Sequence, residues 1–290
     1  MVRERVAMGV PLAAVIFGLL LLDGHLSADL HAWRFIIAGQ DIGPWLRNGT
    51  ITTAIALILT ILTTRELVRL ARACGYRPFA GLAQVFGAGL VVGPFVALNV
   101  QAGARIHDES WGMLWLACAL GVAFLLQGLR RGTERAMAHL ASTLFILFYA
   151  GGLAGFIIKL RMEVGGPSGL ALILFSLILV KMTDTGAFFT GVLFGRHKMI
   201  PWLSPKKTWE GFAGGIVVTV ICALAIGTYL RHLGYLTLPA GPLAYPWGLV
   251  IFGLLMAIFS VAGDLAASLL KRDAAVKDSG GALPGRGGLR

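Results

Sequence analysis

Apolar stretches long enough to cross a bilayer recur along almost the whole 290-residue chain and leave few folds open to it. A bilayer core of roughly 30 Å needs about 20 mostly apolar residues in a helix. Lipid-exposed backbone must satisfy its own polar groups, so such segments form helices. We therefore predict an all-α, polytopic transmembrane helix bundle of about eight spans, at residues 6–22, 48–64, 80–98, 111–127, 138–158, 169–193, 211–230 and 247–270.

The composition favours a membrane protein over a soluble one. Hydrophobic residues make up 57% of the chain and charged residues 13%, with a mean hydropathy of +0.80. Soluble domains carry roughly a quarter charged residues. The net charge of +11 is then explained by contact with anionic membrane lipids. We expect no nucleic-acid partner, because no soluble basic domain exists to bind one.

The basic residues predict the orientation of the chain. If the eight spans alternate, most lysines and arginines fall in loops on the side of the N-terminus. Basic loops stay in the cytoplasm, so we predict a cytoplasmic N-terminus and a multi-pass protein of the cell (inner) membrane. The opposite side holds only Arg34, Arg47, Arg105, Lys159, Arg161 and Arg231.

Two connecting segments carry weaker signals. The basic stretch 63–78 has leucines on one face and arginines on the other, which predicts an interfacial helix lying on the inner leaflet. The outer loop contains His25 and His31. They fit ordinary polar loop residues better than metal ligands. No metal-binding spacing involves the three cysteines, Cys74, Cys118 and Cys222.

The sixth span contains charged residues where hydrocarbon surrounds the helix. Lys181 and Asp184 interrupt an otherwise apolar segment, and a carboxylate there costs roughly 2.5–3.5 kcal/mol. A local ion pair at i,i+3 is one explanation, and a functional site is the other. Gly186 and Gly191 would let another helix or a ligand approach closely.

The loop after this span is rich in hydroxyl groups and cations. Pro205 is expected to form a turn ahead of Lys206 and Lys207, with Ser204 and Thr208 on either side. Such side chains bind phosphate oxygens. A basic loop that contacts lipid head groups is the alternative interpretation. The spacing of a Walker A loop is absent.

The last span adds a second carboxylate. Asp264, Ser268 and Lys271 share one helix face, and Gly263 would admit a neighbouring helix. Two buried carboxylates on different helices, Asp184 and Asp264, predict a divalent metal such as Mg²⁺. With lysines to bind phosphates, the site has the parts for phosphoryl or nucleotidyl transfer.

Several ordered motifs in the last part of the chain resemble the phosphatidate cytidylyltransferase family, also called the CDP-diacylglycerol synthases. The family signature Ser-x-x-Lys-Arg-x4-Lys-Asp is matched from Ser268 to Asp278, and a Pro-Gly-x-Gly-Gly turn follows at 284–288. The segments 184–188, 204–211 and 263–265 are also similar to the family. Residues 1–290 are expected to form a single membrane domain. The resemblance implies variable N-terminal spans over 1–168 and catalytic spans and loops over 169–290.

The resemblance implies that the chain converts phosphatidate and CTP to CDP-diacylglycerol and pyrophosphate at the membrane, with Mg²⁺. A homodimer is expected by analogy with the family. The resemblance assigns catalysis to Asp184, Asp264, Lys271, Lys277 and Asp278, and the metal to Asp184 and Asp264. Substrate binding is assigned to Ser204, Lys206, Lys207, Thr208, Ser268, Arg272 and Arg286.

Two departures from the family keep alternatives open. Arg286 stands where the family has His, and the sequence stops at Arg290, before the closing Asp-Arg pair of the family. We therefore expect a chain shortened at its C-terminus, and a catalytically impaired homologue is one alternative function. A transporter or lipid flippase is another, because intramembrane Lys and Asp residues also suit ion coupling.

Overall fold

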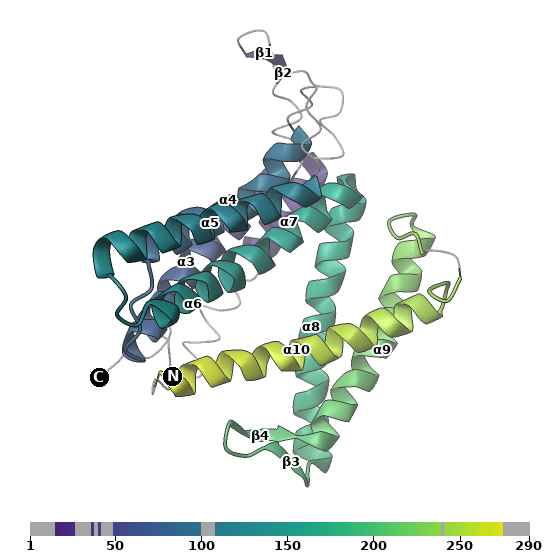
Figure 1. Cartoon of the computed structure of the whole chain (residues 1–290). Coiled ribbons are helices and arrows are strands. Elements are labelled where there is room, and N and C mark those ends of the chain that lie inside the picture. Colours follow the sequence, from purple (N-terminus) through teal and green to yellow (C-terminus); the bar gives the residue numbers. More distant parts are fainter. Residues whose placement is uncertain are drawn as a thin grey trace. The chain divides into compact units, whose positions relative to one another are not determined.

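Helices dominate the computed structural model, which describes residues 15–26, 36–37, 40–41, 49–99, 108–238 and 241–274. Within these residues, seven helical segments are long and apolar enough to cross a membrane (Figure 1). They are α3 (Thr50–Ala73), α4 (Ala80–Asn99), α5 (Asp108–Arg131), α6 (Ala136–Leu147) continued by η2 (Phe148–Gly152) and α7 (Leu153–Val164), α8 (Gly166–Phe194), α9 (Trp209–His232) and α10 (Trp247–Asp273). The polytopic helical fold is therefore confirmed, and each segment overlaps one of the last seven predicted spans.

The first predicted span, 6–22, falls mostly outside the described residues. Its described part belongs to a shorter apolar helix, Val15–Leu26. In the connection that follows, β1 (Ile36–Ile37) pairs antiparallel with β2 (Gln40–Asp41). His31 lies outside the described residues, so the interpretation of the outer-loop histidines stays a prediction, as does the cytoplasmic N-terminus.

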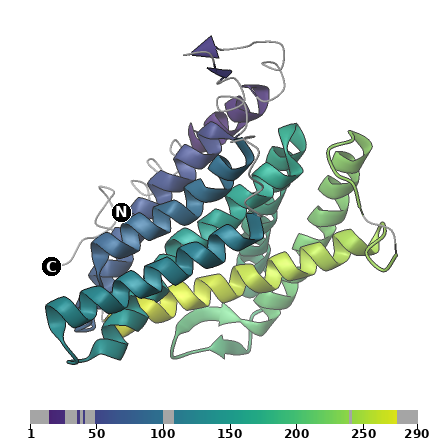
Figure 2. The same cartoon turned by 45° about the horizontal axis from the view of Figure 1, so that its top comes forward.

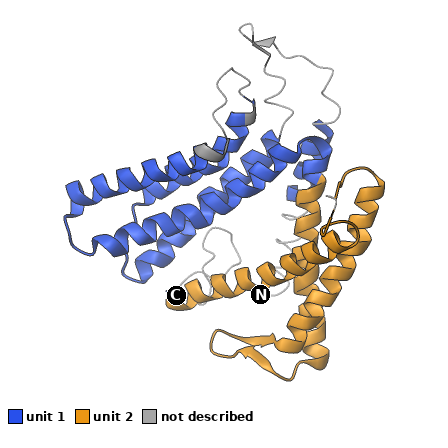
Figure 3. Ribbon diagram, turned by 45° about the vertical axis from the view of Figure 1, so that its right-hand side comes forward, with its two compact units in different colours: residues 1–170, 274–290 blue, residues 171–273 orange. Residues whose placement is uncertain are grey.

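The chain falls into two compact units, which Figure 3 colours separately. Unit 1 comprises residues 1–170 and 274–290, and unit 2 comprises residues 171–273. The predicted roles of residues 1–168 and 169–290 stay predictions.

Unit 1 contains the packed helices α3 to α7, which run side by side in Figures 1 and 2. Ala56 from α3, Val91 and Phe95 from α4 and Ile158 from α7 form a buried cluster. Where α4 crosses η2, a Cβ atom on Gly151 would collide with the backbone of Gly87. Only glycine permits this close approach of two backbones.

The prediction of a separate interfacial helix at 63–78 is wrong, because α3 continues without a break to Ala73. Leu67 and Leu70, whose spacing suggested a lipid-facing side, are instead buried inside the protein. The chain leaves the helix at Gly75, whose φ of 80° suits a residue without a side chain.

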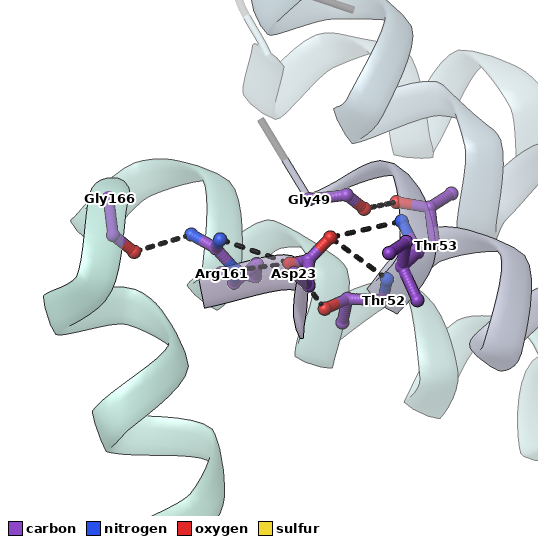
Figure 4. A network of polar contacts seen from close by, with 7 residues as sticks. Asp23, Gly49, Thr52, Thr53, Arg161 and Gly166 are labelled. Carbon is purple, nitrogen blue, oxygen red and sulfur yellow. Dashed lines mark hydrogen bonds and ion pairs between the residues drawn. The ribbon is translucent and has the colours of Figure 1, made fainter. Parts of the chain in front are cut away.

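A buried ion pair joins four segments of unit 1 (Figure 4). Arg161 of α7 lies with its Nη2 atom 3.1 Å from Oδ2 of Asp23, and these side chains are only 1% and 2% exposed. The carboxylate of Asp23 also accepts hydrogen bonds from the backbone N–H of Ile51 and from the hydroxyl of Thr52, at 3.0 and 2.8 Å. Arg161 donates to the carbonyl of Gly166 at 2.7 Å. The charge pattern placed Arg161 in an outer loop. The structure places it in α7, where its side chain is buried.

Unit 2 contains most of α8, the hairpin of β3 (Lys198–Ile200) and β4 (Ser204–Thr208), and helices α9 and α10. Its core holds Phe175, Leu179, Ala223 and Leu249. The two strands are antiparallel, with Lys198 opposite Thr208. Figure 1 shows the hairpin at the start of α9.

Small and hydroxyl-bearing residues bring α8 and α9 close together. A Cβ atom on Gly186 would lie 2.8 Å from Cβ of Val218, and one on Gly191 would lie 3.6 Å from Cα of Gly211. The prediction that these glycines admit another helix is therefore confirmed. Thr183 and Thr219, both fully buried, are joined by a hydrogen bond of 2.7 Å. These contacts fix the helix that carries Asp184 against the helix that follows the hairpin.

Candidate functional site

One pocket in unit 2 gathers the two carboxylates predicted to hold the metal and two of the predicted lysines. Its volume is about 230 Å³. Polar side chains from α8, β4 and α10 face it, namely Asp184, Lys206, Lys207, Thr208 and Asp264. We call it the carboxylate–lysine pocket. The sequence separates these residues by up to eighty positions, so their meeting is a property of the fold.

The hairpin determines where the two lysines lie. The turn is formed by residues 200–203, where the N–H of Leu203 donates to the carbonyl of Ile200 at 3.1 Å. Pro201 therefore occupies the turn, and the prediction of a turn at Pro205 is wrong, because Pro205 lies within β4. A proline is tolerated there because the strand pairs on one side with β3 and belongs to a two-stranded sheet.

The junction between β4 and α9 forms one wall of the pocket. Thr208 is the N-cap of α9, and its hydroxyl accepts a hydrogen bond of 3.1 Å from the N–H of Gly211. Both residues line the pocket. The positive end of the helix macrodipole is therefore close to it, which favours an anion.

Glu210 holds the start of the hairpin against the start of α9. Its carboxylate accepts hydrogen bonds from the backbone N–H groups of Arg196 and His197, at 3.1 and 3.2 Å. It also lies 2.5 Å from Nδ1 of His197. These bonds anchor the loop that carries the lysines. Glu210 was not among the predicted site residues, although an acidic residue in the first turn of a helix is a recognisable signal.

Each carboxylate of the pocket has a lysine partner. Nζ of Lys207 lies 3.2 Å from Oδ2 of Asp264, and Nζ of Lys181 lies 3.7 Å from Oδ2 of Asp184. The predicted i,i+3 pair between Lys181 and Asp184 is thus present, yet Asp184 also lines the pocket. The two carboxylates line the same pocket. Like charges held together in this way favour a cation between them.

The prediction that both carboxylates are buried is wrong. The side chain of Asp184 is 41% exposed and that of Asp264 is 57% exposed. Their apolar neighbours in the sequence suggested burial, but such neighbours face outward too: Phe188 is 64% exposed and Val192 is 69% exposed. In a membrane helix an apolar neighbour indicates lipid as readily as a protein core.

Apolar side chains that were not among the predicted site residues complete the pocket. Phe188 of α8, Met199 of β3, Phe212 of α9 and Val261 of α10 all line it. Phe188 belongs to a segment that carried the family resemblance, so its position was a usable signal. The pocket thus presents charged groups beside apolar side chains. This arrangement suits a ligand that has both a charged and an apolar part.

The remaining predicted site residues lie elsewhere or outside the described residues. Ser204 is in β4 and does not line the pocket. Ser268 donates to the carbonyl of Asp264 at 2.8 Å, and Lys271 and Arg272 are in the last turn of α10. No described atom lies within 4 Å of a Cβ built on Gly263, so the expected close approach of a helix is not found there. Three predicted residues fall outside the described ranges, namely Lys277, Asp278 and Arg286.

The donor set of the pocket fits a magnesium ion better than a transition metal. Asp184 and Asp264 offer only oxygen ligands, and Mg²⁺ commonly takes one or two carboxylates with substrate phosphates and water. Among the described residues, no group of three or more His, Cys, Asp or Glu side chains gathers as a metal site. A cation held here would therefore depend on oxygen atoms of the substrate.

Comparison with known proteins supports the same chemistry. A model of the "Cytidylyltransferase family" matches residues 31–290. A phosphatidate cytidylyltransferase of Mycobacterium bovis is 30% identical over 249 residues, covering 81% of this chain and 73% of the relative. One of Staphylococcus saprophyticus is 29% identical over 84% of this chain and 85% of its own length. A chloroplastic one of Arabidopsis thaliana is 37% identical over 60% of this chain and 46% of its own length.

The match extends well beyond the motifs that suggested it. The family model covers nearly the whole chain, including residues from unit 1 as well as the carboxylate–lysine pocket of unit 2. The resemblance seen in the sequence is therefore confirmed across most of its length. The chain belongs to the cytidylyltransferase family.

Proposed function

We propose that the chain is a membrane-embedded phosphatidate cytidylyltransferase. Its substrates are CTP and phosphatidate, and its products are CDP-diacylglycerol and pyrophosphate. The observation that carries the proposal is the meeting of Asp184, Asp264, Lys206 and Lys207 around one pocket. The family match supports the reaction, and it does not favour a transporter or flippase.

The proposed reaction is a displacement at phosphorus. A phosphate oxygen of phosphatidate attacks the α-phosphorus of CTP, and the bond from that phosphorus to the oxygen bridging to the β-phosphorus breaks. Pyrophosphate leaves with the bonding electrons. Catalysis of such a transfer consists mostly of holding the reacting groups in line and stabilising negative charge.

Different residues of the pocket bind the phosphates and the metal ion. Lys206 and Lys207 bind oxygens of the triphosphate, and the start of α9, with Thr208 at its cap, adds a positive end dipole. Asp184 and Asp264 hold a magnesium ion, which neutralises phosphate charge when it is bound. Lys207 then exchanges Asp264, its partner at 3.2 Å, for a phosphate oxygen.

The apolar side of the pocket is assigned to the lipid substrate. Phe188, Phe212 and Val261 line it, and Phe188 is 64% exposed on a helix of membrane-crossing length. CTP enters from water and phosphatidate enters from the bilayer. A pocket with both charged and apolar lining residues can therefore bind the two substrates. We place this side of the bilayer in the cytoplasm on the distribution of basic loops.

The family-derived roles of seven further residues belong to the same proposal. Ser204, Ser268 and Arg272 would orient phosphates, and Lys271 would neutralise charge. Lys277 and Asp278 complete the family signature, and Arg286 would bind phosphate without transferring a proton. A homodimer is proposed on the resemblance alone, and light scattering of the purified protein measures it.

The reaction is tested with the purified chain, labelled CTP and phosphatidate in mixed micelles. We expect label in the lipid phase and one pyrophosphate released for each CDP-diacylglycerol formed. Both should require phosphatidate and magnesium. Reconstituted vesicles that accumulate substrate without consuming CTP would overturn the proposal in favour of a transporter.

A further inference from the structure

A second pocket lies in unit 1 and is lined mainly by basic and polar groups. It has a volume of about 470 Å³ and is lined by Arg72, Gly75, Tyr76, Arg77, Pro78 and Arg131. We call it the arginine pocket. It shares no residue with the carboxylate–lysine pocket, and the sequence motifs that suggested catalysis do not include it.

Three separate segments bring the arginines together. Arg72 is in the last turn of α3, Arg77 is in the connection between α3 and α4, and Arg131 is the last residue of α5. The guanidinium of Arg131 donates to the carbonyl of Arg77 and lies 4.2 Å from the ring centroid of Phe79. The N–H of Arg77 donates to Nδ1 of His139 at 3.2 Å. The guanidinium of Arg131 and the backbone of Arg77 are therefore held in place before any ligand arrives.

The charges of this pocket are not balanced within the described residues. Arg72, Arg77 and Arg131 line the same pocket, so their like charges repel one another. No described carboxylate lines the pocket, and none of the ion pairs among described residues includes its three arginines. Guanidinium groups gathered without a carboxylate raise the energy of the protein, and a bound anion removes that repulsion. Their planar donor pairs match the oxygens of a phosphate group.

The surroundings favour a lipid as the source of the phosphate. Leu129, two positions before Arg131, is 83% exposed, and Met137, in the first turn of α6, is 82% exposed. Both belong to helical segments of membrane-crossing length. The ends of these helices therefore present exposed apolar side chains as well as basic ones, and a phospholipid offers both an apolar and an anionic part.

We propose that the arginine pocket binds the phosphate group of an anionic membrane lipid, with the acyl chains against the ends of α5 and α6. This adds a lipid site on unit 1 to the reaction proposed for unit 2. Arg72, Arg77 and Arg131 bind the phosphate oxygens, and the hydroxyl of Tyr76 provides a further donor.

The test measures phosphatidylglycerol bound to the purified full chain in detergent by native mass spectrometry. This lipid is anionic and is not a substrate of the proposed reaction, and no CTP is present, so the result is independent of the proposed function. We expect phosphatidylglycerol to bind at least about tenfold more tightly than phosphatidylcholine. Equal binding of the two lipids would overturn the proposal.

Paired variants locate the site. Arg72→Gln with Arg77→Gln removes two charges from the pocket, and Arg69→Gln with Arg130→Gln removes two charges from exposed positions that do not line it. The first pair should weaken binding at least about tenfold and the second less than about twofold. Equal effects would show a general charge attraction and would contradict a built site.

Two further experiments use the wild-type chain. Adding phosphatidylglycerol should slow hydrogen exchange at the backbone amides of residues 74–79 in the wild-type chain, and unchanged exchange there would contradict the proposal. Inorganic phosphate should fail to displace the lipid at equal concentration. Displacement would show that the pocket binds free phosphate, and the lipid assignment would then be wrong.

Discussion

The two units each contain an ion pair between a cation and an aspartate, and the pairs differ in almost every other respect. In unit 1, Arg161 and Asp23 are 1% and 2% exposed, and backbone and hydroxyl groups share their remaining hydrogen bonds. In unit 2, Lys207 and Asp264 are 27% and 57% exposed and line a pocket. The first pair is closed to ligands, and the second can exchange its partner.

This contrast separates a structural charge from a functional one. A buried pair whose partners are all supplied by the protein has no capacity left for a substrate, and breaking it leaves an uncompensated charge. An exposed pair contributes little to stability. Its members keep free coordination sites for phosphate and metal. A charged side chain inside a membrane protein therefore indicates a functional site only where the protein does not already satisfy all of its hydrogen-bonding groups.

The largest expected effect on stability follows from breaking the closed pair. Arg161→Met should lower the free energy of unfolding by about 3–5 kcal/mol, because Asp23 would stay buried without its cation. Unfolding of the detergent-purified chain by a denaturing detergent measures this. The double variant Arg161→Met with Asp23→Leu should recover part of the loss. A single variant within about 1 kcal/mol of the wild type would contradict a structural role.

Removing a carboxylate from the open pair should affect turnover instead. Asp264→Asn should lower CDP-diacylglycerol formation by about 10²–10³-fold, as expected for loss of an electrostatic group from an active site. The unfolding free energy should change by less than about 1 kcal/mol, since the pair is exposed. Glu163→Gln is the matched control, because Glu163 forms an exposed pair with Lys159 and lines neither the carboxylate–lysine pocket nor the arginine pocket. Equal activities of the two variants would remove Asp264 from the site.

The lysine of the open pair should have a smaller effect on the same assay. Lys207→Met is expected to lower activity roughly tenfold to a hundredfold, mostly through a higher KM for CTP, since a charge-assisted bond to phosphate is lost. Lys207→Arg should restore part of the activity. If KM for CTP stayed constant while only stability changed, Lys207 would serve the fold alone.

The smallest effect concerns the helix start that supports the pocket. Thr208→Ala removes the N-cap of α9 and should cost about 1 kcal/mol of stability, whereas Thr208→Ser should keep most of it. Thr185→Ala is a suitable comparison, because Thr185 is exposed and bonds only to the carbonyl of Lys181, one turn back. Thermal unfolding distinguishes them, and equal shifts would contradict the capping role.

Much of the fold could be predicted because membrane helices obey a simple length rule. The seven described long helices each overlap a span predicted from apolar length alone. The end of α3 was missed for a related reason. Arginines at 65, 69 and 72 suggested an exit from the membrane, but the buried leucines between them kept the helix intact.

Five of the predicted site residues line one pocket, and their exposure could not be predicted from the sequence. Asp184 and Asp264 were chosen because charge in an apolar context is costly, and Lys206, Lys207 and Thr208 because cations and hydroxyl groups bind phosphate oxygens. The two carboxylates were predicted to be buried and are exposed. Apolar neighbours in a sequence do not show whether a helix faces lipid or the protein core. The pairing of Arg161 with Asp23 links positions 138 apart, and no local pattern could have indicated it.

The most direct test of the proposed site measures CTP binding by equilibrium dialysis with and without magnesium. The wild-type chain should bind CTP more tightly when magnesium is present, because we propose that Asp184 and Asp264 hold a magnesium ion beside the triphosphate. Asp184→Asn with Asp264→Asn should abolish that magnesium dependence. A double variant that kept it in full would place the metal and CTP elsewhere and contradict the account.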